Sequence, residues 1–155
     1  MIKFVRLDYR LLHGQVVFSW VQHTGVNRII IVDDEAANDE LKKTALGLTK
    51  PANCRLNIFT LSTALNKMPK IETLTDSIMF IFGNTKTLAA FCKAYPKLKE
   101  VNYGALANKP GSKQYDQSVF LTPEEQADTQ TLLDMGVKLY MQQTPSHKLT
   151  LLDHI

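Results

Sequence analysis

The chain has little cysteine. Cys54 and Cys92 are the only two in 155 residues, and they lie far apart without metal-like spacing. This argues against a disulfide framework or a cysteine-based metal site, and we expect two reduced, buried thiols. An excess of one charge is also missing, because 18 basic residues face 15 acidic ones for a formal net charge of +3. That balance is too weak to indicate nucleic-acid binding, although it allows attraction to phosphorylated partners.

Long hydrophobic runs are absent as well. No apolar stretch approaches the roughly 20 residues that cross a bilayer, and the N-terminus has no apolar signal core. We therefore expect a cytoplasmic protein, which could still work beside a membrane complex. The sequence also lacks a glycine-rich phosphate loop of the GxxxxGKS or GxxxxGKT type. We accordingly expect no nucleotide, metal ion or other cofactor.

Strand-like and helix-like segments alternate along the chain. The β-branched run Arg28–Val32 and the apolar segment 77–82 are typical of strands covered on both faces, as in a parallel sheet. Further strands are expected near residues 2–5, 55–60, 101–103, 119–121 and 137–141. Helices are expected over 14–25, 36–48, 61–67, 87–95 and 122–136. The pattern predicts a single three-layer α/β domain over residues 1–155, with helices on both faces of a mostly parallel sheet of about six to seven strands.

Two segments interrupt this alternation. Residues 104–118 are polar and contain Gly, Pro, Asn and Lys, so they are predicted to form one long loop. The tail from Ser146 is predicted to form a short helix that uses Leu149, Leu151 and Leu152.

The most informative segment runs from Arg6 to Val16 and reads Arg-Leu-Asp-Tyr-Arg-Leu-Leu-His-Gly-Gln-Val. It connects the first strand to the first helix, where open α/β sheets usually keep their ligand sites. A free imidazole titrates near pH ~6.5, so His13 offers a nucleophilic nitrogen at neutral pH. Attack on a phosphoryl donor would create a phosphohistidine, whose negative charge must be stabilised.

Neighbouring residues suit that chemistry. Arg6 and Arg10 carry guanidinium groups that match phosphate oxygens, and Asp8 could either orient Arg10 or hold one imidazole N–H. Gly14 allows close backbone approach and exposes amides to an anion. The alternative is a loop histidine that caps the helix, with Arg6 paired to Asp8 on the surface.

This segment, with Trp20 four residues on, resembles the Arg-(Ile/Val)-Asp-Asp-Arg-Leu-Ile-His-Gly-Gln-Val…Trp signature of enzyme IIB components. These belong to the mannose/fructose/sorbose family of the bacterial sugar phosphotransferase system. The likeness continues in Arg28-Ile-Ile-Ile-Val-Asp-Asp-Glu and in Val101-Asn-Tyr-Gly. The length and the order of elements also match a whole IIB domain.

The resemblance implies a phosphoryl carrier with protein-Npi-phosphohistidine–sugar phosphotransferase activity. His13 would accept phosphate from a IIA component, through its δ nitrogen, and pass it to a sugar in the membrane IIC/IID complex. Arg10 would stabilise the negative charge of the phosphate, and Asp8 would act as an orienting group. The protein would be cytoplasmic, associate peripherally with the membrane permease, and be a candidate homodimer.

The family motif also suggests residues that meet the phosphate or a partner. Arg6, Gly14 and Gln15 are candidates from the motif itself. Asn84, Thr85 and Gly104 end neighbouring strands and could line the same crevice, either as backbone phosphate contacts or as plain turn residues.

The chain departs from the family at Tyr9, where a second acidic residue is usual, and in a smaller way at Ala105, where glycine is usual. An apolar rim beside His13 is expected, because the site must dock two partners in turn, and Leu11, Leu12 and Tyr9 are its candidates. Trp20 is expected in the core. The competing hypothesis is a non-catalytic regulatory domain that binds IIA or an anionic metabolite without passing phosphate on.

Overall fold

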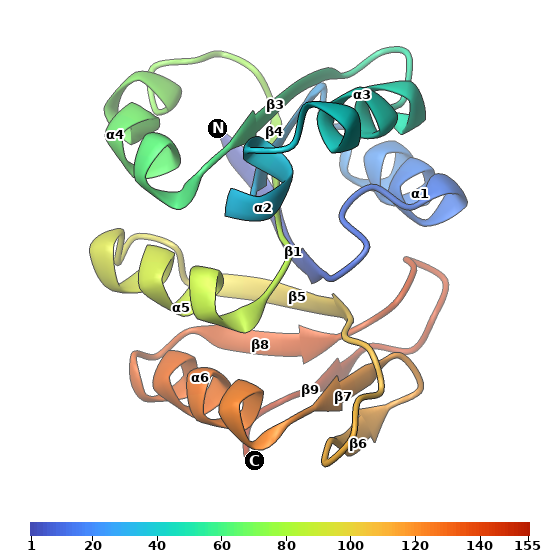
Figure 1. Ribbon diagram of the computed structural model, residues 1–155, viewed down its shortest axis with the longest axis vertical. Helices are drawn as coiled ribbons and strands as arrows, with labels where there is room; N and C mark the ends of the chain where they lie inside the picture. Colours follow the sequence, from blue (N-terminus) through green and yellow to red (C-terminus); the bar gives the residue numbers. More distant parts are fainter.

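The computed structural model describes residues 1–155 (Figure 1). Its strands are β1 (Ile2–Asp8), β2 (Arg28–Val32), β3 (Arg55–Phe59), β4 (Ile78–Phe82), β5 (Glu100–Ala105), β6 (Lys113–Asp116), β7 (Val119–Leu121), β8 (Lys138–Met141) and β9 (Thr150–Leu151). Its helices are α1 (Gly14–Thr24), α2 (Asp34–Ala37), α3 (Glu40–Thr49), α4 (Leu61–Ile71), α5 (Thr85–Ala94) and α6 (Pro123–Asp134). Seven strands form the main sheet, in the order β3-β2-β4-β1-β5-β8-β9. The predicted fold class is therefore confirmed.

Strand β1 lies inside the sheet and pairs in parallel on both sides. Val5 faces Phe80 on β4, and Arg6 faces Asn102 on β5. The chain moves from β1 toward β2 and β3 on one side, then returns through β4 to β5 on the other. Such a reversal of strand order opens a crevice at the carboxyl ends of the strands, and β1 ends there with Asp8.

Helices cover both faces of the sheet (Figure 1). Helices α1 and α3 lie on one side, whereas α4, α5 and α6 lie on the other. Side chains alternate between the two faces, so that Ile29 and Ile31 join the 15-residue core under α1, while Ile30 and Val32 join the 25-residue core under α4 to α6. Burial on both faces explains why β4 and residues 29–32 of β2 are continuously apolar rather than alternating.

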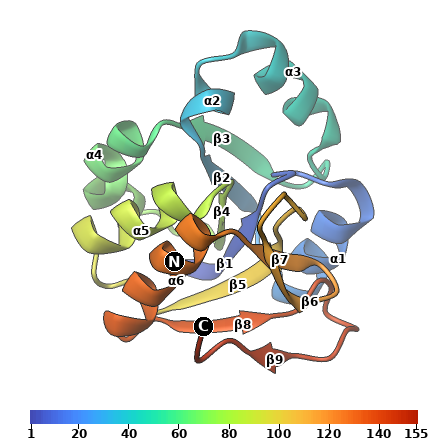
Figure 2. The same ribbon diagram turned by 60° about the horizontal axis from the view of Figure 1, so that its bottom comes forward.

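Two predictions about the C-terminal third are wrong. The tail is not a helix, because Thr150 and Leu151 form strand β9, which pairs antiparallel with β8 at the outer edge of the sheet (Figure 2). This places Leu152 in the core and leaves Leu149 and Leu151 exposed. Residues 104–118 are not all loop either, since β6 pairs with β7 in an antiparallel hairpin.

Two helices differ from their predicted bounds. The helix expected over 36–48 is divided, because the Asp39 carboxylate accepts a hydrogen bond from the Lys42 amide and starts α3 as a new helix. Helix α4 continues past its expected end at Lys67 because Met68 and Ile71 pack into the core. None of the helices is long and apolar enough to cross a membrane.

Candidate functional site

His13 stands at the N-cap position of α1, directly after the loop that follows β1. Its backbone is extended, with φ −129° and ψ 90°, and its carbonyl accepts hydrogen bonds from the amides of Val16 at 3.1 Å and Val17 at 3.4 Å. The imidazole is exposed and makes no capping hydrogen bond. The capping alternative is therefore wrong for the side chain, and both ring nitrogens are open to a reaction partner.

The loop before His13 is a fixed turn. The Leu11 amide donates to the Asp8 carbonyl at 3.0 Å, and the Tyr9 amide donates to the Ala105 carbonyl of β5 at 3.1 Å. Leu11 has φ 61°, which is uncommon for a leucine and costs energy that surrounding contacts must offset. Its buried side chain provides such contacts, and Gly83 at the end of β4 leaves room for it.

Asp8 organises the charged groups of this turn. Its Oδ1 accepts hydrogen bonds from the backbone N and the Nε of Arg10 at 2.9 and 3.1 Å. Its Oδ2 accepts from Nη2 of Arg10 at 3.2 Å and from Nη2 of Arg6 at 3.1 Å. Of the two roles considered for Asp8, the structure thus shows the one in which it holds Arg10, and no hydrogen bond joins it to His13.

Arg6 lies beneath the turn with no exposed surface. Its Nη1 donates to the Asn102 side chain at 2.6 Å and to the Gln142 carbonyl at 3.3 Å, and its guanidinium carbon lies 5.8 Å from the centre of the Trp20 ring. Burial lowers the pKa of Arg6, and the neighbouring Asp8 opposes that change. The pair is therefore a buried support of the site, not a surface pair as in the alternative considered above.

The charges of the turn do not cancel. Arg6 and Arg10 each pair with the single carboxylate of Asp8, which leaves a formal excess of one positive charge. The Arg10 side chain keeps 22% of its surface exposed, and it uses Nε and Nη2 toward Asp8, so its Nη1 is free to meet an anion. The N-terminal amides of α1, including those of the exposed Gly14 and Gln15, add partial positive charge beside His13.

Three of the predicted phosphate or partner contacts are buried instead. The buried guanidinium of Arg6 lies directly against Gly104, so a side chain at position 104 would overlap it. The Thr85 hydroxyl donates to Asp128 at 2.7 Å and ties α5 to α6. Asn84 is exposed, and its side chain caps α5 by accepting from the Thr87 amide at 2.8 Å.

The expected apolar rim is only partly present. Leu11 and Leu12 are buried in the core under α1, because the turn directs both side chains inward, so assigning them to the rim was wrong. Tyr9 is 50% exposed, as expected of a rim residue. Phe18 was not predicted, yet it is 46% exposed on α1 one helical turn after Gly14. Its position four residues after Gly14 could have identified it, since residues i and i+4 share a helix face.

Sequence reasoning also missed Asn102 and Gln142. The Asn102 side chain bridges the site by accepting from Arg6 and donating to the Gln142 carbonyl at 3.0 Å. An asparagine between Val101 and Tyr103 was the available signal, because a buried amide requires partners. Trp20 is buried as predicted, and it also covers Arg6.

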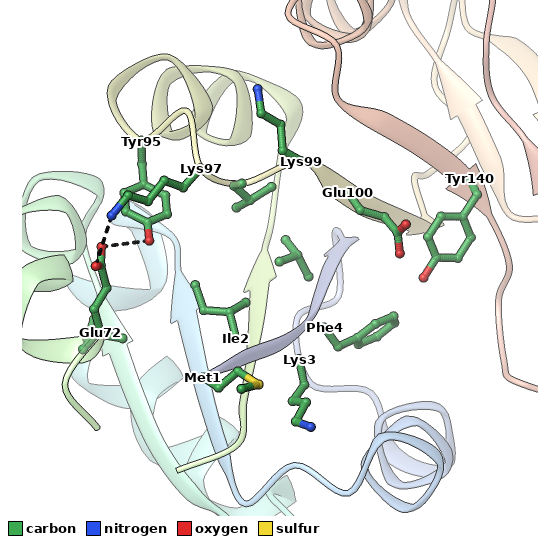
Figure 3. Close-up of a pocket in the computed structure, with 13 residues that line it drawn as sticks. Met1, Ile2, Lys3, Phe4, Glu72, Tyr95, Lys97, Lys99, Glu100 and Tyr140 are labelled. Carbon is green, nitrogen blue, oxygen red and sulfur yellow. Dashed lines mark hydrogen bonds and ion pairs between the residues drawn. The ribbon is translucent and has the colours of Figure 1, made fainter. Parts of the chain in front are cut away.

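A cavity lies elsewhere, where β1 and β5 begin (Figure 3). It has a volume of about 570 Å³, and Phe4, Glu100 and Tyr140 are among its lining residues. Figure 3 shows Lys97 and Tyr95 both reaching Glu72 at its rim. The cavity thus lies at the opposite end of β1 from His13.

The comparisons with known proteins agree with this fold and this motif. A family model described as "PTS system sorbose subfamily IIB component" matches residues 2–155. The fructose-specific EIIB component of Bacillus subtilis is 31% identical over 94% of this chain and 89% of its own length. The sorbose-specific EIIB component of Klebsiella pneumoniae is 30% identical, over 89% of this chain and 84% of its own length.

Solved structures give the same result. The IIB domain of the sorbose permease from Klebsiella pneumoniae superimposes with a TM-score of 0.88 at 28% identity, covering 97% of this chain and 92% of that one. The N-acetylgalactosamine-specific IIB component 1 from Escherichia coli gives a TM-score of 0.91 at 26% identity, with 98% and 99% covered. With sequence and structure matching over nearly its whole length, the chain belongs to the sorbose-type IIB components, the phosphoryl-transfer subunits of sugar phosphotransferase systems.

Proposed function

We propose that His13 carries a phosphoryl group from a IIA component to a sugar bound by the membrane IIC/IID complex during uptake. The observation that supports this most directly is an exposed, unpartnered imidazole on the same turn as a guanidinium that Asp8 holds in place. The protein would act as a protein-Npi-phosphohistidine–sugar phosphotransferase in the cytoplasm, at the surface of the permease. Residues 1–155 would form its single IIB domain.

Each transfer exchanges one bond to phosphorus for another. In the first, a ring nitrogen of His13, Nδ1 by resemblance to the family, bonds to the phosphorus of the donor phosphohistidine. The donor N–P bond breaks, and its electron pair leaves with the donor imidazole. In the second, the 6-hydroxyl oxygen of the sugar bonds to phosphorus, the N–P bond to His13 breaks, and the hydroxyl proton balances the electron pair returned to the ring.

Such transfers require alignment and neutralised charge more than covalent help from the protein. Arg10 would face the phosphoryl oxygens with the N–H groups that Asp8 does not occupy. The amides of Gly14 and Gln15 would add a second set of donors at the helix N-terminus. Arg6 would act through Asp8, since its burial keeps it from the phosphate.

The test is phosphorylation with labelled phosphoenolpyruvate, the general phosphotransferase proteins and a cognate IIA component. We expect an acid-labile, base-stable phosphate that is lost in His13→Ala and kept in His154→Ala, a control whose exposed imidazole pairs only with Asp153. We also expect Arg10→Ala to slow labelling by about 100- to 1,000-fold while the protein stays folded, the range seen when one charge-stabilising donor is lost. Absence of label on the wild-type protein would refute the proposal.

The same assay separates carrier from regulator. Membrane vesicles that contain the cognate IIC and IID proteins and sugar should remove the label from His13 and yield sugar phosphate. A stable phosphoprotein that these vesicles fail to discharge would instead support the non-catalytic regulatory domain.

A further inference from the structure

We propose that Tyr9 is a positioning residue, whose aromatic ring holds the Arg10 guanidinium in the orientation needed for phosphoryl transfer at His13. This inference rests on the proposed function and adds a residue to its site. The guanidinium carbon of Arg10 lies 5.8 Å from the centre of the Tyr9 ring, which is within the range of a cation–π contact.

The ring and the carboxylate restrain different parts of Arg10. Asp8 binds the edge of the guanidinium through Nε and Nη2. The Tyr9 ring lies instead within cation–π range of the central carbon of the guanidinium. With the Asp8 carboxylate as the only contact, the planar guanidinium of Arg10 could still rotate about the line that joins the two groups. The second contact limits this motion and leaves Nη1 available to a phosphoryl oxygen.

The Tyr9 backbone is rigid enough for this role. Its amide is tied to Ala105 of β5 at 3.1 Å, and the turn closes two residues later between Leu11 and Asp8. The ring itself is half exposed and belongs to neither core cluster, so it contributes little to folding. The charged group that lies against the ring is the guanidinium of Arg10.

An uncharged ring also preserves the electrostatics of the turn. Two guanidinium groups and one carboxylate leave one net positive charge there. An aspartate at position 9 would cancel this charge and compete with Asp8 for Arg10. Tyrosine restrains the same guanidinium without reducing its attraction to phosphate, and the contact strengthens when a docked partner excludes water.

The test compares Tyr9→Phe and Tyr9→Leu in single-turnover phosphorylation of His13 by phospho-IIA. We expect Tyr9→Leu to lower the maximal rate by about 3- to 30-fold, the range of one cation–π contact, with the half-saturating IIA concentration unchanged. Tyr9→Phe should keep the wild-type rate because it keeps the ring. Leu41→Ala, which removes an exposed apolar side chain from α3 rather than from the rim, is the control and should keep the wild-type maximal rate.

A double-mutant cycle shows whether Tyr9 acts through Arg10. In an Arg10→Ala background, Tyr9→Leu should have no further effect, whereas multiplying effects would overturn the proposal. A raised half-saturating concentration with an unchanged maximal rate would also overturn it, because Tyr9 would then be a docking residue.

A readout without phosphate separates this inference from the proposed function. The Nε–H resonance of Arg10 in a ¹⁵N-labelled protein should move and narrow in Tyr9→Leu, because ring current and restraint are lost, but not in Leu41→Ala. An unchanged resonance refutes the contact even if His13 is phosphorylated. If the resonance changes but wild-type His13 takes no label, the contact stands, while the proposed function and the positioning role built on it both fail.

Discussion

Gly104→Ala is expected to destabilise the protein far more than a single added methyl group normally does. A β carbon at position 104 would overlap the carbon and both terminal nitrogens of the Arg6 guanidinium. Arg6 has no exposed surface and cannot move outward without leaving Asn102 and Asp8. The substitution therefore disrupts a buried polar network instead of filling empty space.

The magnitude follows from that network. Breaking a buried ion pair by removing one partner costs about 3–5 kcal/mol, because the remaining charge stays buried. Arg10 still pairs with Asp8, so the lower half of that range is expected here. With a urea m-value of about 2 kcal/mol/M, a loss of about 3–4 kcal/mol lowers the unfolding midpoint by roughly 1.5–2 M. This is a large part of the total stability of about 5–15 kcal/mol typical of a domain.

Urea unfolding of a matched set of variants tests the reasoning. Gly47→Ala is the control, because position 47 lies inside α3 and a β carbon added there would meet no atom within 4 Å. Alanine at this position should stabilise the protein by about 0.5–1 kcal/mol. In an Arg6→Ala background the overlap is gone, so adding Gly104→Ala should cost less than about 0.5 kcal/mol. A Gly104→Ala midpoint equal to that of wild type, or additive losses in the double variant, would refute the proposed packing.

Two further predictions concern groups outside the turn. Thr85→Val should cost about 1–2 kcal/mol by removing the hydroxyl that donates to Asp128, yet leave phosphorylation of His13 unchanged; a slower transfer in the folded variant would return Thr85 to the phosphate site. Burial raises the pKa of the Cys92 thiol to about 12, whereas an unfolded thiol titrates near ~8.5. The native thiol thus stays protonated. Its contribution to the free energy of unfolding is complete below pH ~8.5 and falls by up to about 1.4 kcal/mol per pH unit above that. Unfolding free energies measured from pH 7.5 to 10 should therefore decline more steeply for wild type than for Cys92→Ala. Parallel declines would contradict the assignment.

The sheet could be predicted because burial on both faces leaves a pattern in the chain. Residues 29–32 of β2 and 78–82 of β4 are continuously apolar and buried. The edges carry a weaker pattern. Strand β9 has two residues, both exposed, and its pairing with β8 depends on an edge that only the assembled sheet presents.

The site could be predicted where its residues are close in sequence. Asp8, Arg10 and His13 lie within one turn, where their spacing allowed either phosphate chemistry or a capping histidine, and the resemblance of the whole motif to a family favoured phosphate. The supports of Arg6 come from far along the chain: Asn102 is 96 residues away and Gln142 is 136. Strand order brings them together, because β5 pairs with β1 and the residue after β8 follows at the same edge. Arg6 was accordingly expected at the phosphate, where its charge suits, rather than beneath it.

The burial of Arg6 reconciles two demands that a phosphoryl carrier at this site would face. An imidazole that meets two partners in turn has to stand exposed on an open surface, yet the charge that stabilises its phosphate must not reorient between encounters. Surface arginines reorient freely, since an exposed ion pair contributes little. Here Asp8 is completely buried and is fixed by Arg6, which is in turn held by Asn102, Gln142 and the Trp20 ring. Arg10 can therefore be partly exposed and still be held, because the carboxylate that orients it belongs to the interior of the sheet.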